Sequence, residues 1–192
     1  MRWHNTSQSF GSLAKFFHWT SAGAFIGAYL VVYYVIWFMD DMAPEALPVL
    51  NIHWVLGLIV GFLVIPRLLW RGWDAQPAQP PGSRWEHALA HAAHWGLYGL
   101  LIAMPLTGYL GTGAPTNFGL FTLAGFNETA LFHWISHTFA LGWDAFEAPI
   151  DAVHHFIGKY IAWLVVLVHV VAALFHHGVR RDNVLKRMLP GG

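Results

Sequence analysis

The hydrophobic positions of the chain fall into four long runs, separated by polar or proline-containing breaks. The runs cover about residues 16–39, 52–70, 85–110 and 154–177. Each is close to the length of roughly 20 residues that a helix needs to cross the apolar layer of a membrane. The pattern therefore predicts an all-α integral membrane protein built as a bundle of four transmembrane helices.

The breaks between the runs have the composition of connections. Residues 40–45 are acidic and contain Pro44, and residues 67–84 are basic, with a proline-rich centre that no helix would cross. The longest connection, residues 111–153, lies on the outer side and contains the short amphipathic stretch 131–137. We expect that stretch to form a helix at the membrane surface, with His133 and His137 facing outward.

Composition agrees with this class of protein. Of the 192 residues, 56% are hydrophobic and only 10% are charged, whereas soluble proteins are about one quarter charged. The chain has no cysteine, which excludes disulfides, iron–sulfur ligation and covalently attached haem, so any metal is held by nitrogen or oxygen. The sequence contains no basic patch with interleaved aromatic residues of the kind that would suggest nucleic-acid binding. We expect a single membrane domain, residues 1–192, in contact with lipid.

The charged residues predict an orientation. With both termini in the cytoplasm, nine of the ten Lys and Arg residues lie inside, and only Lys159 lies outside, as the positive-inside rule favours. The same orientation makes the outer face negative, because seven acidic residues lie there. The inner basic residues are Arg2, Lys15, Arg67, Arg71, Arg84, Arg180, Arg181, Lys186 and Arg187, and the outer acidic residues are Asp40, Asp41, Glu45, Glu128, Asp144, Glu147 and Asp151.

The last hydrophobic run carries two histidines, His155 and His169, fourteen positions apart. At roughly 100° and 1.5 Å per residue they lie on nearly the same helix face, about 21 Å from each other. An imidazole inside a membrane is costly unless its nitrogen atoms have partners, so both side chains are candidates for a functional site.

The depth of each histidine indicates its partners. In four antiparallel helices the start of the second run and the start of the fourth lie at the outer level, which brings His53 to the level of His155. The beginnings of the first and third runs lie at the inner level. Three histidines are therefore available to His169: His18, His91 and His94.

Two imidazoles at each level suit a particular kind of cofactor. A zinc ion needs three or four protein ligands, whereas a haem supplies four nitrogen atoms itself and needs only two axial ligands. Gly57, one turn after His53, and the Gly23-x-x-x-Gly27 spacing leave room for a flat molecule. The pattern favours two haem sites stacked between the helices of the bundle. A histidine-lined pathway for a divalent metal ion or for protons is the alternative.

Several motifs at these positions resemble the bacterial di-haem cytochrome b561 family. They are His18-Trp19, Ile52-His53-x-x-x-Gly57, Ala90-His91-x-x-His94-x-x-x-Tyr98, and His155-x13-His169-x6-His176-His177 followed by Asp182-Asn183 and Arg187-Met188-Leu189-Pro190. The resemblance implies a bacterial inner-membrane protein with two b haems, the outer one ligated by His53 and His155 and the inner one by His18 and His169. One class of the family oxidises superoxide and passes the electron to ubiquinone.

The resemblance also implies a quinone site at His176, near the inner haem. From their spacing, His91 and His94 compete with His18 for the inner level, and His91 would otherwise bond a haem propionate or a quinone oxygen. Lys159, one turn beyond His155, is the only basic residue that would attract superoxide to the outer face. A negative face repels that anion and steers a cationic protein instead. We therefore expect a superoxide:ubiquinone oxidoreductase that uses Lys159 and His176, or else a shuttle subunit for a periplasmic dehydrogenase or c-type cytochrome.

Overall fold

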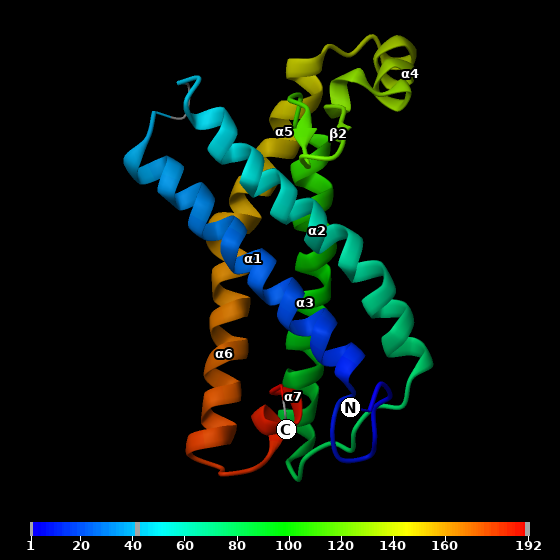
Figure 1. Ribbon diagram of the computed structural model, residues 1–192, viewed down its shortest axis with the longest axis vertical. Coiled ribbons are helices and arrows are strands. Elements are labelled where there is room, and N and C mark those ends of the chain that lie inside the picture. The colour runs from blue at the N-terminus through cyan, green and yellow to red at the C-terminus, as the bar shows by residue number, and fades with distance from the viewer. Residues whose placement is uncertain (1, 41–42, 191–192) are drawn as a thin grey trace.

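Four long helices, each apolar enough to cross a membrane, form the body of the molecule (Figure 1). The computed structural model describes residues 2–40 and 43–190, so Asp41 lies outside the described residues. The first three spans are α1 (Ser12–Phe38), α2 (Ala46–Trp73) and α3 (Arg84–Leu110). The fourth consists of α5 (Trp143–Phe156), the π-helix η2 (Ile157–Ala162) and α6 (Trp163–Gly178). The four-helix prediction is confirmed.

The spans are longer than the hydrophobic runs predicted. α2 begins at Ala46 and passes Pro66 before it ends at Trp73. The fourth span begins at Trp143 instead of 154, because residues such as Asp144 and Glu147 occupy extra helical turns that hydrophobicity does not mark. The beginning of α3 has a local cause: Ser83 and Glu86 form a capping box in which each side chain accepts a hydrogen bond from the other's backbone N–H.

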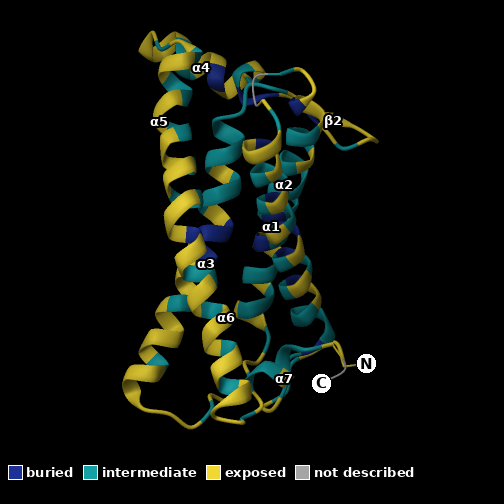
Figure 2. Cartoon of the chain, turned by 90° about the vertical axis from the view of Figure 1, so that its left-hand side faces the viewer, coloured by how far each residue is buried: buried dark blue, intermediate teal, exposed yellow. Residues whose placement is uncertain are grey.

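Small side chains let α1 and α2 pack closely together. Ala24 of α1 lies in one buried cluster with Val60 and Val64 of α2 and with Tyr98 and Leu101 of α3. Figure 2 shows the buried residues where these helices meet, while the outward faces are mostly exposed. Those exposed faces are rich in large hydrophobic side chains. They therefore suit a lipid surrounding, in which they remain removed from water.

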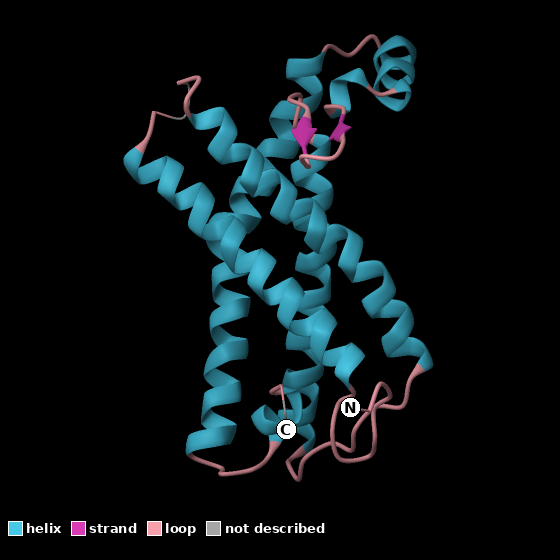
Figure 3. Ribbon diagram, in the orientation of Figure 1, coloured by secondary structure: helices cyan, strands magenta, loops and turns pink. Residues whose placement is uncertain are grey.

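The connection between α3 and α5 has its own small structure at the end of the bundle opposite the termini (Figure 3). It contains the hairpin β1 (Thr116–Asn117) and β2 (Thr122–Leu123), the 3-10 turn η1 (Phe126–Glu128) and the helix α4 (Ala130–Phe139). The helix expected at 131–137 is therefore present, and its two histidines are exposed.

Aromatic side chains form the core of this connection. Phe126 is 3% exposed and stacks on Phe146 at 5.5 Å between ring centres, while Phe132 meets Trp143 at 5.1 Å. The Asn51 side chain on α2 accepts from the Asn117 N–H at 2.7 Å and donates to the Asn117 carbonyl at 2.9 Å. These contacts fix the hairpin over the N-terminal end of α2.

The two chain ends lie at the other end of the bundle (Figure 1). Hydrogen bonds join the terminal segments to the ends of the long helices. The Asp74 carboxylate accepts from the Asn5 N–H at 2.8 Å. The Arg180 guanidinium bonds Glu86 at 2.6 Å, and Trp19 donates its indole N–H to the carbonyl of Met188, the last residue of α7 (Val184–Met188), at 2.8 Å. The segments that flank the bundle thus hold together the ends of α1, α3 and α6 that lie beside the chain termini.

Candidate functional site

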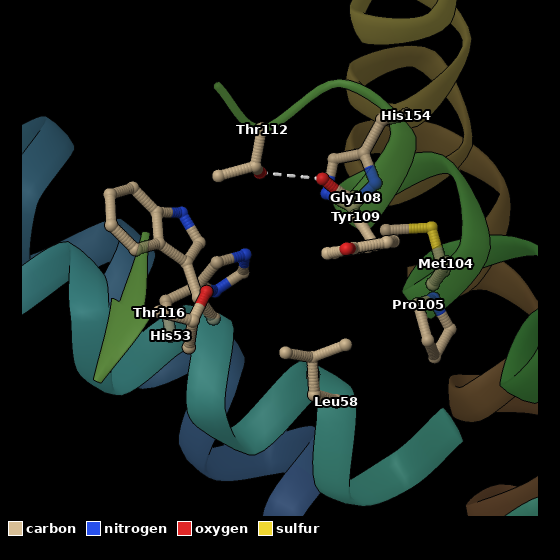
Figure 4. A pocket seen from close by; sticks show the side chains of 11 residues that line it. His53, Leu58, Met104, Pro105, Gly108, Tyr109, Thr112, Thr116 and His154 are labelled. Atoms are coloured by element: carbon tan, nitrogen blue, oxygen red, sulfur yellow. Dashed lines mark hydrogen bonds between the residues drawn. The ribbon is translucent and has the colours of Figure 1, made fainter. Parts of the chain in front are cut away.

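Two histidine rings from different helices lie close together at the level that the sequence predicts to be the outer one. His53 on α2 and His154 on α5 have ring centres 6.3 Å apart. Both rings line one pocket, together with Gly57, Met104 and Gly108 (Figure 4). The region beside Gly57 is open, since an added Cβ there would meet no atom within 4 Å. The free surface predicted next to His53 is therefore present.

Hydrogen bonds fix which nitrogen atom of each outer ring is free. His53 donates from Nδ1 to the Ala28 carbonyl at 2.9 Å. The Thr107 hydroxyl gives its hydrogen to the Ala103 carbonyl at 2.6 Å, so it accepts from Nδ1 of His154 at 3.0 Å. Each ring therefore keeps the lone pair of Nε2 unused, which is the arrangement found in metal-ligating histidines.

His155, which the sequence pairs with His53, lies differently. Its side chain is exposed, and its ring meets that of His154 at 6.2 Å. His154 was not among the ligands predicted from the sequence. The adjacent pair His154-His155 was the sequence signal from which His154 could have been considered as a ligand as well.

The inner level gathers three of the four predicted histidines. His169 on α6 lies between His18 on α1 and His94 on α3, with ring centres 6.2 Å and 5.8 Å away. His18 and His169 are half-buried and His94 is exposed. His91 is also exposed, and its Nε2 accepts from the Trp95 indole N–H at 3.0 Å. The predicted depth match between α6 and the starts of α1 and α3 is present in the structure.

Cationic groups lie beside this inner cluster. The Arg67 guanidinium is 3.3 Å from Nδ1 of His18, and the guanidinium carbons of Arg67 and Arg71 lie 5.3 Å and 5.6 Å from the centre of the Tyr98 ring. A His18 that ligates through Nε2 carries its hydrogen on Nδ1, so Arg67 must then turn to another acceptor. The carboxylates of haem propionates are acceptors of the right charge.

The residues at both levels fit a haem better than a bare metal ion. Metal–nitrogen bonds of about 2 Å on each side of an iron leave the two ring centres roughly 6 Å apart. The outer pair at 6.3 Å and the inner His18–His169 pair at 6.2 Å match this separation. Within residues 2–40 and 43–190, no three His, Asp or Glu side chains are arranged to hold a metal ion by themselves.

The predicted quinone residue has a carboxylate partner. His176 and Asp182 form a 2.6 Å bond between Nδ1 and Oδ2, with side chains 24% and 23% exposed. Burial raises the pKa of Asp182, but the hydrogen bonds from His176 and from the Val184 N–H outweigh it, so that this pKa lies below its ordinary value. The carboxylate is therefore ionised at neutral pH.

Lys159, the predicted attractor of superoxide, is exposed on η2. Its Nζ lies 5.5 Å from the centre of the Tyr160 ring. The backbone of its π-helix packs against α3 and continues directly into α6. Lys159 therefore lies within the fourth span, five residues after His154 and four after His155.

Known proteins resemble nearly all of this chain. Residues 9–191 match the family model for prokaryotic cytochrome b561. Cytochrome b561 homolog 2 of Escherichia coli K12 is 31% identical over 200 residues, which cover 98% of this chain and 95% of that protein. The probable superoxide oxidase CybB of Yersinia pestis is 29% identical over 144 residues, which cover 72% of this chain and 73% of its own. The region that matches the family model, residues 9–191, contains both histidine levels described above.

Proposed function

We propose, from the premise that this chain belongs to the prokaryotic cytochrome b561 family, that it carries electrons through a bacterial inner membrane from a donor on the outer side to ubiquinone on the inner side. Membership itself gives membrane electron transfer and haem b. Two haems, the donor and the acceptor belong to the proposal. The observation that carries it is the pair of opposed imidazoles at each of two levels.

In this proposal the chain's own side chains hold the cofactors. His18 and His169 would hold the inner haem, and His53 would hold the outer haem together with one histidine of the 154–155 pair. Bound haem b supplies one-electron transfer at each level. Arg67 and Arg71 balance propionate charge at the inner level, and His94, beside His169, bonds a propionate or a quinone oxygen. We give His91 the same role.

The proposed orientation in the membrane is supported by the charges and by the position of the chain ends. Both termini lie at one end of the bundle (Figure 1), and the basic residues of the sequence belong mostly to the segments at that end. The positive-inside rule then places this end in the cytoplasm. The hairpin and α4 consequently face the periplasm, where an outer donor would bind.

At the cytoplasmic end His176 is proposed to bind ubiquinone. The ionised Asp182 carboxylate accepts from Nδ1–H of His176. When the ring also carries a hydrogen on Nε2, it would donate that hydrogen to a quinone carbonyl. His176 lies seven residues after His169, roughly 10 Å along the helix. Two electrons and two protons convert ubiquinone to ubiquinol, and this side chain would pass on one of the protons.

Superoxide is the proposed donor, and the support is the name of the Yersinia pestis relative, a probable superoxide oxidase. Each superoxide anion gives up one electron and leaves as dioxygen, so two anions are needed for each ubiquinol. Lys159 is the outward cation in the proposed orientation. It would raise the local concentration of the anion near the outer level.

A second candidate is a shuttle subunit that takes electrons from a periplasmic dehydrogenase or a c-type cytochrome. The observation in its favour is charge, because Glu128, Asp144 and Glu147 lie on the same outer end as the hairpin. A negative surface steers a cationic protein toward it and slows the approach of an anion. The two candidates share the haem ligands and differ only in the donor.

The experiment that separates the candidates is rapid mixing of the oxidised, purified protein with superoxide, followed by haem absorbance. We expect fast reduction that falls by about tenfold at low salt in Lys159→Glu and by less at high ionic strength. Lys186→Glu makes the same charge change at the opposite end and should leave the rate unchanged. Reduction by a cationic c-type cytochrome but not by superoxide would contradict the oxidase and support the shuttle.

A further inference from the structure

We infer that His154, and not His155, is the second axial ligand of the outer haem, because the π-helix η2 turns it toward His53. The inference rests on the proposed haem at the outer level and names one of its ligands. It concerns the angular register of the fourth span, which the spacing of histidines in the sequence does not determine.

The register of a regular α-helix would favour His155. At about 100° per residue, His155, fourteen residues before His169, would lie roughly 40° from the direction of His169 around the helix axis. His154, fifteen residues before His169, would lie roughly 60° away on the other side. A π-helix has i→i+5 bonds and accommodates about one extra residue in the helix. With η2 (Ile157–Ala162) between the two sites, His154 lies roughly 40° from His169 and His155 roughly 140° away.

The observed positions agree with the π-helical register. His154 is half-buried with its ring 6.3 Å from that of His53, whereas His155 is exposed. The backbone of α3 passes closely under His154, since a Cβ added at Gly108 would lie 3.1 Å from Cε1 of the ring. The Thr107 hydroxyl then holds Nδ1, and Nε2 remains available as a ligand.

Two neighbouring helices hold the π-helix in place. Tyr29 on α1 donates its hydroxyl hydrogen to the Gly158 carbonyl at 2.8 Å, and its ring meets Trp163 at 5.0 Å. On the α3 side, a Cβ added at Gly158 would lie 3.2 Å from Cε of Met104. The extra residue is therefore fixed by contacts within the bundle, and the orientation of His154 is fixed with it.

Alanine variants test the assignment through haem content, measured as the pyridine haemochrome, and through the low-spin ferric signal in electron paramagnetic resonance. We expect His154→Ala and His53→Ala each to lose about half of the haem, and His155→Ala to keep all of it. Loss of haem in His155→Ala with retention in His154→Ala would overturn the inference. Wild-type protein with no haem would instead refute the proposed function.

A substitution that impairs folding is distinguished by chemical rescue. In His154→Gly, added imidazole should restore the second low-spin signal, because the free ligand occupies the position of the missing ring. The same treatment of His155→Gly should change nothing, as that variant should already show both signals. The assignment would be contradicted if imidazole restored a missing low-spin signal in His155→Gly while His154→Gly already showed both signals without imidazole.

A deletion tests the register itself. Removing Ile161, which is exposed within η2, should convert the π-helix to a regular helix and place His154 fourteen residues before His169. The outer haem should then be retained. If His155 is the ligand, the same deletion leaves it thirteen residues away, about 140° from its required direction, and the outer haem should be lost.

Discussion

Replacing His176 by alanine should stop electrons from leaving the protein without affecting how they enter. The ring lies at the inner end of α6, about three quarters removed from solvent, and it is bonded to Asp182 at 2.6 Å. A positioned general acid contributes about 10²- to 10⁴-fold to a proton-coupled step. We therefore expect reoxidation by a soluble ubiquinone analogue to slow by about that factor in His176→Ala, with both haems present.

Asp182→Asn should give a smaller loss whose size follows from the bond that it changes. A hydrogen bond to a charged group contributes about 1.5–3 kcal/mol and a neutral one about 0.5–1.5 kcal/mol. The difference of about 1–1.5 kcal/mol corresponds to roughly a tenfold slower reoxidation. The pKa of Asp182 lies below its ordinary value, so the carboxylate's contribution is complete above about pH 4 and is lost only as the pH falls through that lowered pKa.

The assay is stopped-flow reoxidation of the pre-reduced protein, with haem content measured on the same preparation. His177→Ala is the matched control, because it removes an exposed histidine from the next position of the same helix. Its reoxidation should match the wild type. Wild-type reoxidation in His176→Ala, or equal slowing in His177→Ala, would refute the reasoning that places a quinone at His176.

Two further results are expected. At the inner level, His18→Ala should lose the inner haem, while His94→Ala should keep it with a changed midpoint potential. If His18→Ala keeps the inner haem and His94→Ala loses it, His94 is the partner of His169. In the connection between α3 and α5, Phe126→Ala should lower the free energy of unfolding by about 3–5 kcal/mol, because the ring is buried among aromatic neighbours. Denaturant titration measures this loss, and Phe121→Ala, which removes an exposed ring, is the control. Equal losses in the two variants would show that the aromatic cluster contributes little to stability.

The four spans could be predicted because the apolar layer of a membrane imposes its composition on every residue that faces it. The ends of the spans could not, because a helix that continues beyond that layer tolerates polar side chains. Residues 143–153 therefore read as a connection although they form most of α5. The start of α3 is the exception, since Ser83 and Glu86 form a sequence-local capping box.

The depth of the histidines was predictable for a related reason. Helix rise is nearly constant, so counting residues from the end of each span brings His18 and His94 to the level of His169, and the structure places all three rings together. The choice between His18 and His94 depends on how far each helix is rotated about its axis. That rotation is set by packing, for which the sequence carries no local sign.

Angular position is more sensitive than depth to one inserted residue. An extra residue moves a side chain by only about 1.5 Å along the helix but by about 100° around it. In this chain the extra residue lies in the π-helix η2, which is held by a hydrogen bond between Tyr29 and Gly158, 129 positions apart in the sequence. Two adjacent histidines, His154 and His155, therefore satisfy the depth rule equally well. The contacts of the π-helix with α1 and the hydrogen bond of His154 to Thr107 on α3 give the physical reasons to prefer His154.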